Sequence, residues 1–163
     1  MKLRKATVDD IDAMIELRKQ QLVDEGGSPL RNIDRELRDY FFSELESNTF
    51  ISWLALENNT IIATSGLCFF RLPPSYANPS GMVAYITNMF TVKEHRRKGI
   101  ASILLEKVLK EAQVLGFPFV RLWASADGKG LYTKFGFLPA EGYMNLRFLP
   151  FEEGENSRQN TLG

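Results

Sequence analysis

The segment between residues 83 and 123 restricts the fold more than any other part of this sequence. Residues 83–92 are rich in β-forming side chains and lead through a basic stretch into an amphipathic helix, whose apolar face consists of Ala101, Leu104, Val108, Ala112 and Leu115. Gly116 ends this helix, and residues 119–123 form the next predicted strand. A strand, a helix and a second strand in this order make a βαβ unit with two parallel strands. We therefore expect a sheet with a helix packed on it.

Two helices and a hairpin are predicted before this unit. Thr7 and Asp10 have the spacing of a helix-capping box and precede a segment with one apolar face. Apolar residues at steps of three and four predict a second helix from about Asn32. Residues 50–56 and 61–70 are rich in β-forming side chains and are separated by a turn cluster, which predicts a hairpin.

The pattern after the hairpin predicts a loop, a short helix and two more strands. Pro, Gly and Asn between residues 72 and 81 favour a long loop, because proline removes a backbone donor and the other two favour turns. A short helix is expected at residues 131–135. Further strands are expected near Phe137 and at residues 144–148.

Length and composition fit one globular domain. The chain has 163 residues, of which 44% are hydrophobic and 25% are charged, so it is large and apolar enough to bury a core. We expect residues 1–150 to form a single domain. Residues 151–163 are polar and lack periodicity, which predicts a flexible tail.

Charge and the scarcity of metal ligands argue against several function classes. Twenty basic and 20 acidic residues cancel, whereas nucleic-acid-binding proteins usually carry a basic excess, so no nucleic-acid partner is expected. His95 and Cys68 are the only residues of their types, so a two-histidine metal site or an internal disulfide cannot form, and no metal is expected. With no apolar run near the roughly 20 residues of a membrane span and no signal-peptide pattern, we expect no membrane partner and a cytoplasmic protein.

The sequence Arg96-Arg97-Lys98-Gly99-Ile100-Ala101 lies between the first strand of the βαβ unit and the first turn of its helix. A helix N-terminus has unpaired N–H groups and a partial positive charge, so it can hold phosphate oxygens. Gly99 would let an anion approach the backbone, and the flanking basic side chains add positive potential. A solvated basic loop has the same composition, and neither the P-loop nor the dinucleotide-binding fingerprint is present.

A second segment, Leu131-Tyr132-Thr133-Lys134-Phe135-Gly136-Phe137, follows the second strand of the βαβ unit. In this order and at this separation, the two segments together resemble the GNAT superfamily of acyl-CoA-dependent N-acetyltransferases. The resemblance extends from residue 3 to about residue 148. It implies an α/β (α+β) fold with a mixed, mainly antiparallel sheet of six or seven strands, flanked by about four helices.

The resemblance also implies an activity. The expected reaction transfers the acetyl group of acetyl-CoA, without a metal, to a primary amine of a small molecule or peptide by direct attack in a ternary complex. A CoA-binding regulatory or interaction domain that lacks turnover is the alternative. Members of the family often pair through terminal strands, so a homodimer is compatible with the resemblance.

Site residues follow from matching the chain to the family motifs. The CoA pyrophosphate is expected on the backbone amides of Arg97, Lys98, Gly99, Ile100, Ala101 and Ser102. The pantetheine arm is expected along the preceding strand, at Phe90, Thr91 and Val92. Ser125 stands where many members have an asparagine that contacts pantetheine. Tyr132 matches the tyrosine that donates a proton to the departing thiolate.

The general base stays unassigned. Many members have a glutamate on the central strand, but residues 84–92 contain no carboxylate. The alternatives are His95, Glu25, Glu141, or a water held by Tyr85, Thr87 or Asn88. Asp24, Glu25 and Glu141 also suggest a cationic acceptor, such as a polyamine, an aminoglycoside-like compound or a peptide N-terminus, without choosing among them.

Overall fold

The computed structural model describes residues 1–140, Met144 and Leu146. Its elements are β1 (Lys2–Lys5), α1 (Ile11–Asp24), α2 (Asp34–Glu46), β2 (Phe50–Glu57), β3 (Thr60–Arg71), β4 (Met82–Thr91), α3 (Ile100–Val114), β5 (Val120–Leu122) and α4 (Lys129–Lys134), with 3₁₀ turns at Val8–Asp10 (η1) and Lys93–His95 (η2). This order confirms the two N-terminal helices, the hairpin, the βαβ unit and the short helix after it. Across this part of the chain, no helix has the length and apolar character needed to cross a bilayer.

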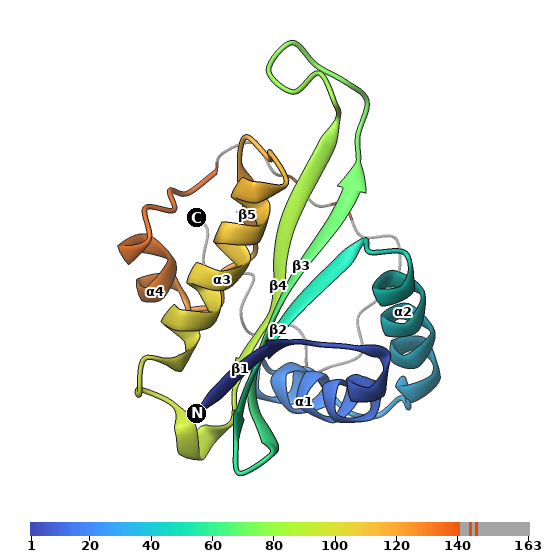
Figure 1. Ribbon diagram of the computed structural model, residues 1–163, viewed down its shortest axis with the longest axis vertical. Coiled ribbons are helices and arrows are strands. Elements are labelled where there is room, and N and C mark those ends of the chain that lie inside the picture. The colour runs from blue at the N-terminus through green and yellow to red at the C-terminus, as the bar shows by residue number, and fades with distance from the viewer. Residues whose placement is uncertain (141–143, 145, 147–163) are drawn as a thin grey trace.

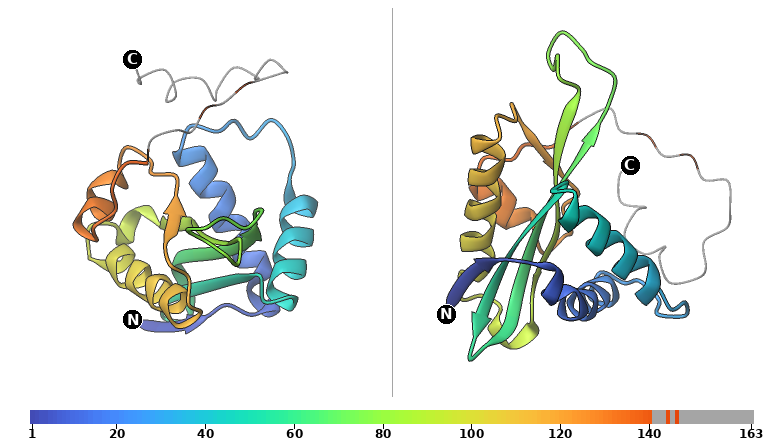
Figure 2. Two further views of the ribbon diagram at one scale, coloured as in Figure 1. Left: turned by 90° about the horizontal axis from the view of Figure 1, so that it is seen from above. Right: turned by 45° about the vertical axis from the view of Figure 1, so that its right-hand side comes forward.

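The strands form one five-stranded sheet in the order β1-β2-β3-β4-β5. The first four strands are antiparallel, and β5 is parallel to β4. The sheet is therefore mixed and mainly antiparallel, as expected. In Figure 1, α3 and α4 lie on one side of the sheet and α1 and α2 on the other, and the view from above in Figure 2 shows the same three layers. The segment between β3 and β4 extends beyond the sheet as a long loop, which confirms the loop predicted at residues 72–81 (Figure 1).

Each face of the sheet buries its own apolar cluster. On the α3 face, Leu104, Leu105 and Val108 are fully buried against side chains of β2, β3 and β4. On the other face, apolar residues of α1 pack with Phe41 of α2 and Phe50 of β2. Helices thus cover both faces of the sheet, because each helix can bury its apolar stripe only against a sheet face.

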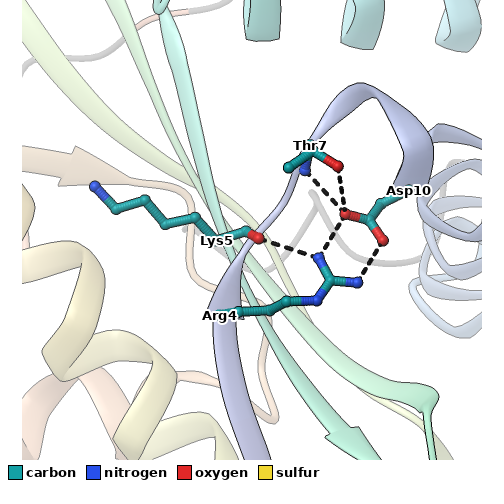
Figure 3. A network of polar contacts seen from close by, with 4 residues as sticks. All are labelled: Arg4, Lys5, Thr7 and Asp10. Carbon is teal, nitrogen blue, oxygen red and sulfur yellow. Dashed lines mark hydrogen bonds and ion pairs between the residues drawn. The ribbon is translucent and has the colours of Figure 1, made fainter.

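An ionic network fixes the start of α1 to β1 (Figure 3). The Arg4 guanidinium donates two hydrogen bonds of 2.7 Å to the carboxylate of Asp10. The same carboxylate accepts a hydrogen bond of 2.9 Å from the backbone N–H of Thr7, which is the reach-back contact predicted from their spacing. These contacts hold the pKa of Asp10 below its usual value, with the Arg4 hydrogen bond as the largest cause.

One strand prediction does not match the structure, and another lies largely outside the described residues. Phe137 lies in no strand because its backbone N–H donates to the carbonyl of Tyr132, at 3.1 Å, while Gly136 adopts a φ of +88°. This is a Schellman-type end of α4, so the backbone of Phe137 caps the helix. Met144 and Leu146, within the strand predicted at 144–148, have no regular structure, and the rest of that strand and the tail at 151–163 lie outside the described residues. The described sheet thus has five strands, not six or seven.

Candidate active site

The basic loop before α3 presents unpaired backbone amides at an open surface. Arg97 and Gly99 both have left-handed backbone conformations, with φ of +62° and +80°. The first hydrogen bond of α3 joins the N–H of Ile103 to the carbonyl of Gly99, so the amides of residues 100–102 have no partner within the helix. A Cβ atom added to Gly99 would have no heavy atom within 4 Å. Unpaired N–H groups and open space at a helix end are features of anion-binding sites in proteins.

The residues of this loop differ in exposure. Arg97, Lys98 and Gly99 are exposed, Ala101 and Ser102 are half-buried, and Ile100 is buried in the core. The two basic side chains therefore stand at the surface while Ile100 fixes the first turn of α3 from below. Residues 97–102 are consecutive and form the loop and the first turn of α3, and their binding of the pyrophosphate stays a prediction.

Arg96, which precedes this group, serves a different purpose. Its Nε donates a hydrogen bond of 2.8 Å to the carbonyl of Thr91, and its guanidinium lies 5.4 Å from the ring centre of Phe90. A second nitrogen of the guanidinium is ion-paired with Asp24 of α1. Arg96 therefore ties the loop to β4 and α1, and the charge of Asp24 is engaged in that tie.

A bulge in β4 follows the residues at which β4 pairs with β5. Thr64 is opposite Phe90 and Gly66 is opposite Thr87, so two residues of β4 face the single residue Ser65. Within the bulge, Asn88 has a φ of +50°. Pairing of β4 with β5 covers only Ala84–Ile86 and Val120–Leu122, before the bulge. Within the described sheet, the β4 edge beyond it is therefore open to an extended ligand.

Phe90, Thr91 and Val92 lie at this open end of β4. Phe90 and Thr91 are buried, and the Thr91 hydroxyl oxygen has no hydrogen-bond partner among the described residues. Phe90 and Val92 also line a groove of about 370 Å³ between α1 and the end of β4; its other lining residues are Glu16, Lys19, Gln20, Val23, Asp24, Lys93, Glu94 and Arg96. The predicted strand contacts are thus next to the basic loop.

Ser125 and Tyr132 meet at Gly128. The Ser125 hydroxyl accepts a hydrogen bond of 3.2 Å from the backbone N–H of Gly128. A Cβ atom at Gly128 would lie 3.0 Å from the Tyr132 ring and 3.2 Å from the Ser125 hydroxyl, so glycine allows the close approach. Tyr132 is 8% exposed, and this burial raises the pKa of its phenol to about 12, with smaller contributions from Glu25 and Tyr85.

Electrostatic interactions link six polar side chains, which we call the polar cluster: Arg18, Glu25, Tyr40, Cys68, Tyr85 and Tyr132. The neighbours are linked in pairs: Tyr132 interacts electrostatically with Glu25 and Tyr85, and Arg18 with Glu25 and Tyr40. The Cys68 thiol donates a hydrogen bond of 3.5 Å to the backbone carbonyl of Tyr85 and interacts electrostatically with Tyr40. Cys68 is half-buried, and this burial raises the pKa of its thiol, which disfavours a thiolate nucleophile.

Arg18 is a candidate functional residue that sequence reasoning missed. It lies seven residues after Ile11, four after Met14 and three after Ile15, so it falls on the apolar face of α1. A charged residue at such a position was the available signal, since that face was already identified as the core side.

The candidates for a general base lie at different places in the structure. Nδ1 of His95 lies 3.7 Å from Glu57, at the turn end of the β2–β3 hairpin. Glu25 accepts a hydrogen bond of 2.9 Å from Gln21 and belongs to the polar cluster. The Thr87 hydroxyl donates to the side-chain oxygen of Asn88 at 3.3 Å. Glu141 lies outside the described residues.

Comparisons with known proteins agree on one family. Residues 11–137 match a family model described as the acetyltransferase (GNAT) family. The fold matches a predicted acetyltransferase from Clostridium acetobutylicum, solved with acetyl-CoA, at 40% identity and a TM-score of 0.87, over 90% of this chain and 95% of that one. No match to a curated protein was found.

Two more distant structures share the fold. One is a GCN5-related N-acetyltransferase from Ralstonia eutropha, with 23% identity, a TM-score of 0.82 and coverage of 90% of this chain and 97% of that one. The other is a glucosamine-6-phosphate N-acetyltransferase from Arabidopsis thaliana, with 22% identity, a TM-score of 0.69 and the same coverage.

Proposed function

The chain belongs to the GNAT acetyltransferase family, and we propose that it transfers the acetyl group of acetyl-CoA to a primary amine of a small molecule or peptide. The observation that carries this proposal is the loop between β4 and α3. It combines unpaired helix amides, two left-handed residues and two exposed basic side chains around an open glycine. That combination suits a pyrophosphate better than a neutral ligand.

The rest of acetyl-CoA fits the open edge of β4. Pantetheine contains two amide groups, which can pair with a strand edge as a further extended chain would. Beyond the bulge, β4 offers such an edge at Phe90 and Thr91, and Ser125 adds a hydroxyl on the opposite side, beside Tyr132. These residues would hold the thioester next to the polar cluster.

The reaction needs positioning and proton transfer. The amine nitrogen forms a bond to the acetyl carbon while the carbon–sulfur bond breaks; the nitrogen loses one proton and the sulfur gains one. Tyr132 is the proposed donor to sulfur. Because its pKa is about 12, the phenol stays protonated near neutral pH and can stabilise the developing thiolate by donating a hydrogen bond. Holding both reactants in one complex supplies the proximity that direct attack requires.

Calorimetric titration with acetyl-CoA, followed by a thiol-release assay over a panel of amines, tests the proposal. We expect saturable binding of acetyl-CoA and CoA release that depends on an amine. Binding without release for any amine would favour the regulatory CoA-binding domain, which the absence of a carboxylate between residues 84 and 92 also suggests. Failure to bind acetyl-CoA would exclude both functions.

A further inference from the structure

Arg18 is a half-buried cation with no hydrogen-bond or ion-pair partner in the part of the chain that the structure describes. Its guanidinium makes no hydrogen bond or ion pair within residues 1–140, whereas Arg31, Arg38 and Arg96 each pair with a carboxylate. Burial lowers the pKa of the Arg18 guanidinium, and the nearby Glu25 opposes that shift. An arginine nevertheless stays charged at neutral pH, so Arg18 is a partly desolvated positive charge that no described carboxylate pairs with.

Gln21, one turn further along the same face of α1, is also incompletely bonded. It is 7% exposed, and its Oε1 atom is buried without a partner among the described residues. Its Nε2 donates to Glu25 at 2.9 Å. Buried polar groups without partners destabilise a fold, and an apolar side chain at position 18 would avoid part of that cost. Two such residues on one face indicate that this face is built for a ligand.

The charges of this face are kept apart. Glu25 follows the last residue of α1, seven residues after Arg18; the two interact electrostatically but form no ion pair. Gln21 holds the carboxylate of Glu25 instead. Glu25 also neighbours Tyr132, the proposed proton donor, while Arg18 neighbours Tyr40 on the α2 side. The polar cluster therefore offers a negative group near the proposed reaction centre and a positive group further from it.

We infer that the acceptor amine carries an anionic group, a carboxylate or a phosphate, and that Arg18 binds this group. The inference rests on the proposed acetyl transfer and names its acceptor class. A molecule with an amino group and an anionic group matches the separated charges of Glu25 and Arg18. A polyamine does not, because it would bring further positive charge to Arg18, and the carboxylate of Asp24 is already paired with Arg96.

The test uses pairs of amines that differ only in the anionic group: amino acids with their amides, and glucosamine 6-phosphate with glucosamine. The thiol-release assay gives kcat/KM for each member of a pair. We expect the anionic members to be preferred, and the two sets of pairs distinguish carboxylate from phosphate. In Arg18→Gln, the ratio of the anionic to the neutral member should fall by about 10- to 100-fold, as expected for loss of a charged hydrogen bond.

Arg35→Gln is the matched control, because Arg35 is exposed on α2 and lies outside the polar cluster. For this variant, the ratio of kcat/KM for the anionic amine to kcat/KM for the neutral amine should equal that of the wild type. The melting temperature of Arg18→Gln should not fall below that of the wild type, since the variant removes an unpaired charge. A preference for neutral or polycationic amines, or a ratio unchanged by Arg18→Gln, overturns the inference and leaves acetyl transfer intact. Binding of acetyl-CoA without acetylation of any amine overturns the proposed function itself.

Discussion

At the scale of single residues, Gly99 is the position where backbone shape and ligand binding coincide. Its φ of +80° favours glycine, and the space where a side chain would stand is open. Glu at this position would place volume and negative charge where the pyrophosphate is proposed to bind. We predict that Gly99→Glu weakens acetyl-CoA binding by at least about 100-fold, measured by calorimetry.

Gly116, at the other end of α3, provides a matched control. Its φ is +79°, and a Cβ atom there also has no neighbour within 4 Å. Gly116→Glu therefore imposes the same backbone strain and the same charge change far from the loop. If both variants lost acetyl-CoA binding equally, strain rather than the site would be responsible, and the loop would have been assigned wrongly.

The packing and the pKa of Tyr132 also lead to a prediction. Tyr132→Phe removes the hydroxyl but keeps the ring packed against Phe137, whose ring centre is 5.8 Å away. We predict that kcat falls by about 100-fold while the dissociation constant of acetyl-CoA changes little. In the wild type, the phenol should remain protonated up to about pH 11, so it should cause no loss of kcat below pH 10. An unchanged kcat in Tyr132→Phe would remove the proton-donor role.

At the scale of elements, the bulge of β4 decides where the sheet opens. Asn88 is the left-handed residue of the bulge, its carbonyl accepts a 2.7 Å hydrogen bond from the Thr64 hydroxyl, and its side chain is buried. Asparagine tolerates this conformation, whereas a β-branched residue does not. We predict that Asn88→Val lowers the free energy of unfolding by about 2 kcal/mol, measured with urea, and weakens acetyl-CoA binding.

Asn88→Gly separates backbone strain from loss of the side chain. Both variants remove the contact with Thr87, but glycine adopts the left-handed conformation without strain. We expect Asn88→Gly to lower the free energy of unfolding by less than about 1 kcal/mol. Equal losses in the two variants would show that the bulge does not depend on its left-handed residue.

Local sequence patterns predict some of these elements and not others. The βαβ unit was predictable because its helix has a continuous apolar stripe and its strands have clear ends. The structure of the short segment after α4 was not predictable, because an apolar residue such as Phe137 suits both a strand and the end of a helix. Its role depends on Gly136 and on a hydrogen bond back to Tyr132, and only the folded backbone shows that bond.

At the scale of the whole molecule, the Arg4–Asp10 pair couples the edge of the sheet to the helices on one face (Figure 3). The folded-state pKa of Asp10 is lowered, so this contribution to stability is present above the unfolded pKa, near 3.8, and is lost as the pH falls through the folded value. We predict that the wild type loses this stability only below about pH 4.

Asp10→Asn tests this coupling. The free energy of unfolding of the variant should be about 2 kcal/mol lower than that of the wild type at pH 7, because the hydrogen bonds from Arg4 lose their charged acceptor. Between pH 4 and 2, the stability of the variant should depend less on pH than that of the wild type. Urea unfolding across this pH range gives both quantities. Parallel pH profiles for the two proteins would show that Asp10 does not contribute to the acid sensitivity.

The sequence by itself determined the order of elements, the basic loop before α3 and the family, because apolar periodicity and the two motifs are local properties of the chain. Tertiary structure decided where the sheet opens and what surrounds Tyr132. The bulge appears only in the register of β3 with β4, and the polar cluster joins residues as far apart as Arg18 and Tyr132. Burial changes the pKa values and the hydration of these groups, since the same tyrosine or arginine in solvent would keep its ordinary pKa and its hydration. A sequence does not show burial of a particular side chain until the chain has folded around it.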